Sequence, residues 1–542
     1  MNSHKKAQNA ARRLDLMSRR RSRWSQVYAL LLMLCLAHSG CVTGDEPSTY
    51  YGNVVAPGAQ EFRWSDGGLP QTFDPAFAVA PPDTDAVRAL FEGLTDYDPK
   101  TLAPVPAVAT RWESSADGRV WTFYLRENAR WSNGEQVTAR DFVRSWERTL
   151  KIGPLAPHTE LLSNIEGATT TNAPAQPPPN EPAGQPGNLN PPFGARAVND
   201  QVLEVTLEHA DHSFPALVAH PVFRPVKVEH PDNTQRLNAH ELISNGAFQL
   251  STTEADRVSL ERAKTYWDDA AVALDRVTFV NTENAEEALA AYRAGKVDAV
   301  TNASFEPLAL KLLAPYKDFR RSTFGALTFY AFNTSRPPFD DVRVREALAL
   351  AIDRERVSRD DLGGATVPAG KFLPEAMSGE KPVVDETELI GHDVNRAREL
   401  LAEAGYPDGE GFPLITLLIN RNEQQRIVAQ SIASMWRSTL NVETQLLMKP
   451  WDEYAAVIQA GEYDIVRRGM VMQTTSEWTN LSMLFDGDSP ESETQALKDL
   501  KAMPIYFASS YAVVKPYVSG FDPNVLDAPN LKNTRIDTNW RP

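Results

Sequence analysis

The sequence contains little cysteine, and what it has lies near its start. Two cysteines, Cys35 and Cys41, occur in 542 residues. Cys35 falls inside an apolar run, so a mature chain that begins at Cys41 would keep one thiol and could form no intramolecular disulfide. A fold held together by disulfide bonds is therefore not expected.

Positive charge is also scarce relative to negative charge. The chain has 55 Lys and Arg against 71 Asp and Glu, which gives a formal net charge of −16. Phosphate binding needs a basic face, so a nucleic-acid partner is not expected. The charged fraction of 23% and the hydrophobic fraction of 42% are typical of a globular protein. At about 100–200 residues per domain, the length predicts three or more folding units.

Motifs that carry catalysis, nucleotides or metals are missing. The sequence has no G-x-x-x-x-G-K-S/T loop, no G-x-G-x-x-G after a strand, and neither H-E-x-x-H nor G-x-S-x-G. His209 and His212 have a spacing that a metal could use, but they lack cysteine partners and a converging ligand set. No pair of acidic residues has a spacing that singles it out for acid–base work. We therefore expect a protein that is not an enzyme, with no cofactor and no metal.

Long hydrophobic runs are absent except for one near the N-terminus. Basic residues crowd positions 5 to 23, and an apolar run from Val27 to Ala37 follows. This run is shorter than the about 20 residues that a membrane-spanning helix needs, and the pattern predicts a secretion signal at 1–41. A basic tail followed by a buried helix is the alternative. Translation from Met17, in place of Met1, would give a more ordinary signal.

The end of this segment resembles a bacterial lipobox. Ser39-Gly40-Cys41 predicts cleavage before Cys41 and a lipid on that cysteine, although His38 stands where an aliphatic residue is usual. A conventional signal peptide followed by a free cysteine is the alternative. Residues 42–59 are rich in Gly, Pro, Ser and Thr and are interpreted as a flexible tether.

The body of the chain alternates strand and helix patterns. A strand is predicted at 120–125, where β-branched and aromatic residues cluster, and a helix is predicted to begin at Thr138. The eight prolines within 169–192 indicate an exposed loop. Farther on we expect a strand at 202–207, helices that begin at Asn284, Asp341 and Asp393, strands at 414–419 and 442–448, and a helix between those two strands. This rhythm indicates an α/β layered fold.

Several short stretches, in order along the chain, resemble one family. They include Phe91-Glu92-Gly93-Leu94, Val120-Trp121-Thr122-Phe123, Trp131-Ser132-Asn133-Gly134, Asn245-Gly246-Ala247-Phe248, Thr265-Tyr266-Trp267, Pro338-Phe339-Asp340-Asp341-Val342-Arg343 and Leu400-Leu401-Ala402-Glu403-Ala404-Gly405-Tyr406. The ordered set, which covers the chain from about residue 61 to its end, resembles the substrate-binding proteins of bacterial oligopeptide and dipeptide ABC importers, solute-binding protein family 5.

The resemblance implies an α/β, two-lobed periplasmic-binding-protein fold, type II-like, with an extra subdomain inserted in the first lobe. A hinge joins the lobes, and ligand binding closes them. Lobe I would hold 60–93, 236–302 and 506–542, the inserted subdomain 94–235, and lobe II 303–505. The resemblance also implies a monomer, periplasmic or at the cell surface and anchored to a membrane by lipid. It would capture short peptides and deliver them to the permease subunits of an ABC importer.

The resemblance further implies a set of ligand contacts. They are Val79 and Ala80 in lobe I, and Trp451, Arg467, Gly469, Met470, Val471 and Gln473 in lobe II. Arg467 aligns with a family arginine that can meet a ligand carboxylate, and Trp451 aligns with a tryptophan of the ligand pocket. A surface ion pair for Arg467 and core packing for Trp451 are the alternatives.

Two of these positions depart from the oligopeptide binders. Met470 stands where those proteins have Trp, and Gln473 stands where they have the Asp that binds the free amine of the ligand. A neutral amide cannot supply the charge-assisted bond of a carboxylate. In addition, Pro81 offers no N–H to a ligand strand, and the segment from 480 to 503 is shorter than is usual in the family.

These departures leave other functions open. The same fold could bind a modified peptide, a cell-wall fragment or another solute, and Met470 and Gln473 favour this reading. A sensory or structural lipoprotein uncoupled from transport is the third possibility, and the shortened segment is compatible with it.

Overall fold

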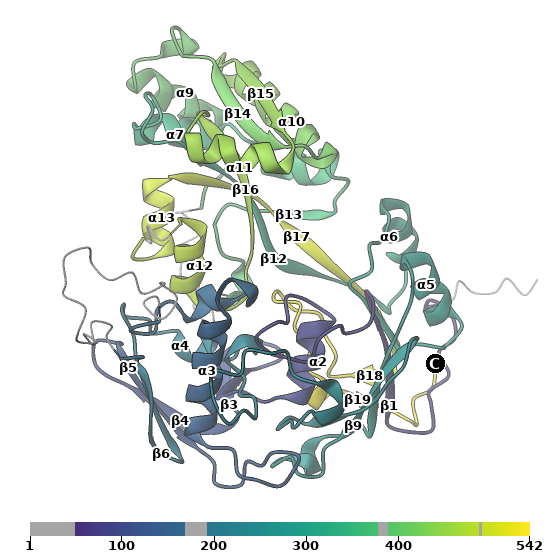
Figure 1. Ribbon diagram of the computed structural model, residues 1–542. Helices are drawn as coiled ribbons and strands as arrows, with labels where there is room; N and C mark the ends of the chain where they lie inside the picture. The colour runs from purple at the N-terminus through teal and green to yellow at the C-terminus, as the bar shows by residue number, and fades with distance from the viewer. Residues whose placement is uncertain (1–48, 169–191, 378–388, 487–489) are drawn as a thin grey trace, which may run out of the picture. The chain divides into compact units, whose positions relative to one another are not determined.

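The computed structural model describes residues 49–168, 192–377, 389–486 and 490–542 (Figure 1). The predicted secretion signal, Cys41 and nearly all of the proline-rich loop lie outside the described residues. Residues Tyr50–Pro542 form one compact unit. In the part of the chain that is described, no helix combines the length and the apolar character needed to cross a membrane.

An eleven-stranded sheet runs through the described part of this unit. Its order is β15-β14-β16-β12-β17-β11-β1-β10-β9-β8, and β13 pairs with β17 away from this path. The long strands β12 and β17 lie antiparallel at its middle, beside β16 (Figure 1). Its strands are β1 (Glu61–Asp66), β8 (Phe248–Thr253), β9 (Arg257–Arg262), β10 (Arg276–Val280), β11 (Ala299–Thr301), β12 (Phe319–Phe332), β13 (Thr366–Pro368), β14 (Ile415–Asn420), β15 (Thr444–Lys449), β16 (Ile465–Val471) and β17 (Ala502–Val514).

Smaller sheets and helices complete the described structure. The smaller sheets are β2 (Thr95–Tyr97) with β3 (Pro104–Pro106), β18 (Val518–Ser519) with β19 (Arg535–Ile536), and a four-stranded sheet of β4 (Ala109–Ser114), β5 (Val120–Leu125), β7 (Val202–Thr206) and β6 (Ala195–Asn199). The α-helices are α2 (Asp83–Leu90), α3 (Ala139–Ile152), α4 (Phe214–Leu217), α5 (Ala285–Arg293), α6 (Pro307–Leu313), α7 (Val342–Leu350), α8 (Arg354–Arg356), α9 (Val394–Glu403), α10 (Glu423–Leu440), α11 (Trp451–Ala460), α12 (Glu477–Leu484) and α13 (Glu493–Asp499).

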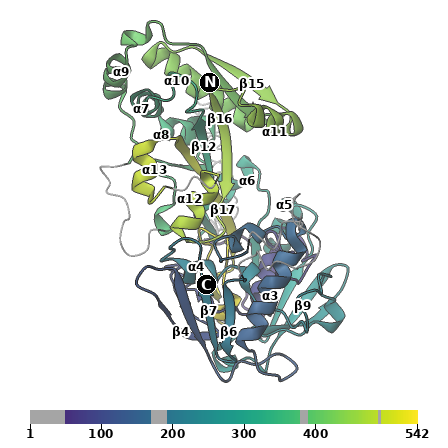
Figure 2. The same cartoon turned by 60° about the vertical axis from the view of Figure 1, so that its left-hand side comes forward.

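One hydrophobic core joins the first strands of the large sheet to the four-stranded sheet. β1 pairs in parallel with both β10 and β11, and Trp64 of β1 is buried in this core. Helix α3 lies against the four-stranded sheet (Figure 2) and buries Phe142 and Trp146 in the same core. The Thr138 side chain and the Asp141 carboxylate cap the start of α3, as the sequence predicts.

A second core lies between β12, β14 and β16 and the helices α7, α9 and α10. β14 pairs in parallel with β15 along six residues and with β16 along two, and Leu417 of β14 is fully buried. The buried Trp436 of α10 donates a hydrogen bond of 2.8 Å from Nε1 to the carbonyl oxygen of Leu348 in α7. The two cores contain residues from the predicted lobes I and II respectively, while the exact lobe limits stay a prediction.

The helices and strands predicted from residue patterns are confirmed, with shifts of one or two residues. Asn284, Asp341 and Asp393 each cap the helix that they were expected to start. The predicted tether of 42–59 is wrong for the part that is described. The Tyr51 amide donates to the Asp318 carboxylate at 2.9 Å, and the Asn53 amide donates to the Arg293 carbonyl at 2.9 Å. These bonds attach the segment to the folded body despite its loop-forming composition.

Candidate ligand-binding site

Strand β16 carries four of the eight predicted ligand contacts. It pairs antiparallel with β12 from Phe332↔Ile465 to Ala326↔Val471. On its other side, β14 pairs only with Ile465 and Val466. From Arg467 to Val471, therefore, no described strand occupies the outer edge of β16. A free strand edge of this kind can accept an extended peptide as an added strand.

The side chains of β16 divide between two faces, because successive residues in a strand point to opposite sides. Arg467, Gly469 and Val471 share one face, and Gly469 and Val471 are exposed. A Cβ at Gly469 would lie 3.1 Å from Nη2 of Arg467, so a side chain at 469 would displace the guanidinium. Met470 lies on the opposite face and packs on a buried cluster that includes Leu327 and Phe507. The structure therefore does not bring Met470 to the face that Arg467 shares.

Arg467 has no acidic partner in the described part of the chain. Its Nη2 donates to the Thr328 hydroxyl at 3.2 Å, and its Nε is buried with no hydrogen-bond partner. No ion pair joins it to any described carboxylate, so the alternative of a surface ion pair is wrong. The neighbouring Arg468, by contrast, forms an ion pair with Asp486.

Trp451 lies outside the core. It is 69% exposed, at the start of α11, and its ring stacks on Tyr454 with a centroid separation of 5.4 Å and an interplanar angle of 16°. The alternative of core packing is therefore wrong. Tyr454 is buried and its hydroxyl donates to the carbonyl oxygen of Arg467. The sequence analysis missed Tyr454, although its i,i+3 spacing from Trp451 on a helix was a usable signal.

The predicted contacts of lobe I lie in the loop before α2. Val79 and Ala80 belong to no strand, and Val79 is 52% exposed. The carbonyl oxygen of Val79 accepts a hydrogen bond of 2.9 Å from Nε2 of His158. The His158 ring meets the His220 ring edge-on, at a centroid separation of 5.0 Å.

The last predicted contact, Gln473, joins this histidine pair. Its carboxamide lies near enough to His220 to raise the pKa of that ring, against the larger causes that lower it. Val79, His158 and His220 thus form a continuous chain of contacts that begins at the predicted ligand residues of lobe I. The sequence analysis missed the role of both histidines, because neither has a spacing that relates it to Val79 or Gln473.

The two histidines titrate in opposite directions. Burial lowers the pKa of His158, but the Glu160 carboxylate and the Val79 carbonyl together outweigh burial, and the net pKa is raised. Burial is the largest cause that holds the pKa of His220 well below its usual range, and the positive charges of His158, Arg88 and Arg224 lower it further. His220 is therefore neutral near pH 7, whereas His158 is the member of the pair that gains a proton first.

The residues after Gln473 fix its position against the segment predicted as the inserted subdomain. Thr474 and Ser476 are both buried. The Tyr97 hydroxyl donates to Thr474 Oγ1 at 3.4 Å, and the Ser476 hydroxyl donates to the Asp211 carboxylate at 3.3 Å. These bonds hold the end of β16 beside His220, so Gln473 does not depend on its own contacts for its place.

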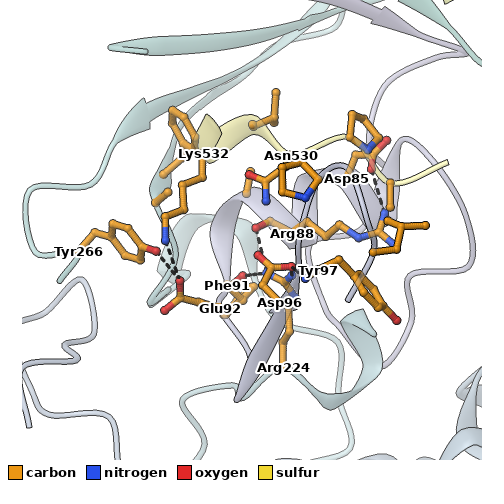
Figure 3. A pocket seen from close by; sticks show the side chains of 18 residues that line it. Asp85, Arg88, Phe91, Glu92, Asp96, Tyr97, Arg224, Tyr266, Asn530 and Lys532 are labelled. Atoms are coloured by element: carbon orange, nitrogen blue, oxygen red, sulfur yellow. Dashed lines mark hydrogen bonds and ion pairs between the residues drawn. The ribbon is translucent and has the colours of Figure 1, made fainter. Parts of the chain in front are cut away.

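A separate charged pocket lies where two of the family-like stretches meet (Figure 3). Glu92 accepts hydrogen bonds from the Tyr266 hydroxyl and, at 2.6 Å, from Trp267 Nε1. Lys532 Nζ lies 3.7 Å from Glu92 Oε1, and the buried Arg224 donates to Asp96 at 3.3 Å. The cavity of about 30 Å³ has room for one or two water molecules and is too small for a peptide. Tyr266, Trp267 and Lys532 thus surround the buried Glu92, which indicates a structural role for the two stretches that contain Glu92 and Tyr266.

A family model describes most of the chain. The model of the bacterial extracellular solute-binding proteins, family 5, middle region, matches residues 103–491. The chain belongs to this family. Family 5 proteins bind a solute and do not transform it, so the protein is a binding protein and not an enzyme. Within the described residues, no group of His, Cys, Asp or Glu has an arrangement that could hold a metal ion.

Named relatives and a solved structure agree with this assignment. The chain is 28% identical to the periplasmic oligopeptide-binding protein OppA of Salmonella typhimurium, over 94% of this chain and 98% of that protein. It is 33% identical to the periplasmic murein peptide-binding protein MppA of Escherichia coli, over 77% of this chain and 76% of that protein. The unliganded open form of MppA superposes with a TM-score of 0.75 at 28% identity, covering 89% of this chain and 98% of MppA. The chain therefore has the two-lobed α/β fold of family 5, as the sequence predicts.

Proposed function

We propose that this family 5 protein captures short peptides outside the cytoplasmic membrane and delivers them to the permease subunits of an ABC importer. The observation that carries the proposal is the outer edge of β16 from Arg467 to Val471, which no described strand occupies and where the Arg467 carbonyl accepts only a side-chain hydrogen bond from Tyr454 among the described residues. Main-chain N–H and C=O groups on such an edge bind a peptide without regard to its side chains. Both named relatives are peptide-binding proteins by name, which supports a peptide as the ligand.

The side chains around this edge suit the ends of a short peptide. Arg467 presents a guanidinium with no acidic partner among the described residues, and a charge-assisted bond to a ligand carboxylate would satisfy it. Trp451 presents an exposed aromatic ring near Arg467. This ring stacks on Tyr454, and the Tyr454 hydroxyl donates a hydrogen bond to the Arg467 carbonyl. Val79, whose carbonyl accepts from His158, Ala80 and Gln473 are the predicted contacts for the other end of the ligand.

The proposal extends to location and anchoring. Cys41 would carry lipid and hold the mature protein, as a monomer, at the outer face of a membrane where the permease is within reach. The segment that contains Cys41 lies outside the described residues, so this part rests on the lipobox-like sequence.

The function is tested with a mixture of di- to pentapeptides and the soluble domain that begins at residue 49. Ligand that binds only the native state raises the melting temperature in proportion to its concentration. We expect mass spectrometry to identify peptides that co-purify with the protein, and to recover them intact after release. Recovery of a non-peptide solute would favour the second candidate, a family 5 protein for another ligand, for which the amide at Gln473 is the supporting observation. Cleaved peptides would contradict the assignment as a binding protein.

A further inference from the structure

The chain enters the folded body beside helices α5 and α6. The Tyr51 amide donates to the Asp318 carboxylate at 2.9 Å, and the Tyr51 ring meets the Tyr316 ring edge-on at a centroid separation of 5.3 Å. The Asn53 amide donates to the carbonyl oxygen of Arg293, the last residue of α5. These contacts fix the point from which the chain continues back toward Cys41.

Helix α6 exposes a pair of leucines close to this point. Leu308 is 69% exposed and Leu312 is 64% exposed, and their spacing along the helix places both on one face. Leu313 is buried in one hydrophobic cluster with Tyr292 of α5, so the other side of α6 holds the helix to the body. Leu308 and Leu312 therefore form an apolar ridge on the surface, the α6 ridge, with the exposed Lys311 beside it.

A groove between α5 and α6 places Tyr51 next to the ridge. The two helices are neighbours in Figure 1, and the groove between them has a volume of about 640 Å³. Tyr51 lines it together with Ala309, which follows Leu308 in α6. Glu286 and Glu306 also line it, so the groove itself is a poor match for an anionic surface. We therefore expect any contact with such a surface to be made by the ridge.

The length of chain before Tyr51 determines what the ridge can reach. Cys41 precedes Tyr51 by ten residues, which span about 36 Å at most when fully extended. A lipid on Cys41 would therefore hold Tyr51, and the ridge beside it, close to the membrane at all times. The membrane surface is then present at a high effective concentration, whereas a soluble partner would have to be recruited.

The chemistry of the ridge suits a lipid surface. Leucines that enter the boundary between headgroups and acyl chains are removed from water, and a lysine beside them can reach the headgroup phosphates. The formal net charge of −16 opposes close contact between an anionic membrane and the rest of the body. Contact should therefore be confined to a small apolar area that carries a cation, as the α6 ridge does.

We propose that Leu308 and Leu312 insert into the surface of the membrane that holds the lipid anchor, so that the α5–α6 side of the protein faces this membrane. The inference rests on the proposed anchoring through Cys41 and adds an orientation to it. A flexible tether alone would turn no particular face of the protein toward the membrane.

The test places a spin label on the ridge of the lipidated full-length protein, bound to vesicles of phosphatidylethanolamine and phosphatidylglycerol. Cys41 would be the one native cysteine of the mature chain and would carry the lipid, so an introduced cysteine is the only free thiol. Leu308→Cys and Leu312→Cys are labelled separately with a nitroxide. Electron paramagnetic resonance then measures how often the label collides with oxygen, which enters lipid, and with a nickel chelate, which stays in water. We expect nickel collisions to fall several-fold on binding to vesicles and oxygen collisions to rise.

The matched control is Leu155→Cys, because Leu155 is 76% exposed in the segment predicted as the inserted subdomain. Its label should remain as accessible to nickel on vesicles as in solution. A charge on the ridge provides a second readout. Leu312→Glu, added to the labelled Leu308→Cys protein, should restore nickel access without releasing the protein from the vesicles, since the lipid still holds it. Leu155→Glu in the same labelled protein should restore nothing.

Flotation of the vesicles separates failure of the inference from failure of the anchor. If the full-length protein does not float with the vesicles, the proposed anchoring is wrong and the inference falls with it. If the protein floats and the ridge labels are as accessible to nickel as the label at 155, the inference is overturned and the anchoring stands. Equal protection of all three labels would also overturn it, because no single face would be turned to the membrane. The same holds if Leu312→Glu leaves the label at 308 protected.

Discussion

Arg148 and Asp74 form a buried ion pair with a separation of 2.6 Å, and their side chains are 1% and 0% exposed. The pair joins α3 to the loop after β1. The Asp74 carboxylate also accepts a hydrogen bond of 3.0 Å from the Leu237 amide, and the loop continues five residues later into Val79. The position of the predicted lobe I ligand contacts therefore depends on a buried charge pair.

Replacing Asp74 with Asn should destabilise the protein by about 3–5 kcal/mol, because it leaves the buried Arg148 guanidinium without a countercharge. Urea unfolding of the soluble domain, followed by circular dichroism, measures the loss. The matched control is Asp200→Asn, which removes the carboxylate of an exposed pair with Arg140. That change should cost about 0–1 kcal/mol. A similarly small cost at Asp74 would contradict the role assigned to the pair.

The carboxyl group of Glu493 should make the stability depend on pH. It is fully buried, accepts a hydrogen bond of 2.6 Å from the Leu373 amide, and burial raises its pKa to about 7. An unfolded glutamate titrates near ~4.3, so the folded state holds the proton to higher pH. The associated stability is complete below a pH of about 4.3 and is lost as the pH rises from there through about 7. The full effect is on the order of 3 kcal/mol.

Glu493→Gln should remove this pH dependence, since the amide cannot ionise. Urea unfolding at several pH values between about 4 and 8 should give a falling free energy of unfolding for the native protein and a flatter profile for the variant. Glu491→Gln, at an exposed position two residues away, should keep the native profile. A native profile that rises with pH over this window would show that Glu493 is not the group that dominates it.

The sequence predicted the elements and the family because both depend on local or ordered patterns. Thr138 with Asp141, and Asn284 with the amide of Glu287, are caps that the chain carries within three or four residues. It did not predict that the segment around Tyr51 is held by Asp318, because that bond joins residues 267 positions apart. A composition rich in loop-forming residues says nothing about a distant acceptor.

The sequence predicted which residues form the candidate site but not their surroundings, because the surroundings depend on contacts between distant parts of the chain. Alignment with the family located the positions Arg467, Trp451 and Gln473, but not what surrounds them. The exposure of Trp451 and the lack of an acidic partner for Arg467 depend on α11 and β12, which tertiary packing brings together. The contact between the His158 and His220 rings, whose centroids lie 5.0 Å apart, joins residues from separate segments of the chain. No spacing in the sequence encodes that meeting.

The lipid anchor is tested by a change at one residue. Cys41→Ser removes the thiol that a lipid would be attached to, so the mature protein should move from the membrane fraction to the soluble fraction. Fractionation of cells followed by immunoblotting measures the shift. Cys35→Ser is the matched control, because Cys35 lies in the apolar run that would be cleaved off. Membrane association that persists in the Cys41 variant would reject lipidation at this position.

Arg467 should bind the carboxylate end of the ligand. Among the described residues its guanidinium donates only to Thr328 and its buried Nε has no partner, so a ligand carboxylate would complete its hydrogen bonds. A charge-assisted bond contributes about 1.5–3 kcal/mol, which corresponds to roughly a tenfold to hundredfold change in affinity. We expect Arg467→Met to weaken binding of a peptide acid by that factor and to change binding of the matching peptide amide much less. Calorimetry with both peptides measures the difference.

The control for this prediction is the adjacent arginine of the same strand. Arg468 points to the other face and is neutralised by Asp486, with Nη2 at 2.9 Å from Oδ1. Arg468→Met removes the same charge and nearly the same volume without reaching the face of Gly469 and Val471. It should leave the ratio of acid to amide affinity as in the native protein. If the two variants lower that ratio equally, long-range charge and not a bond from Arg467 accounts for carboxylate binding. If neither variant changes the ratio, the carboxylate lies elsewhere.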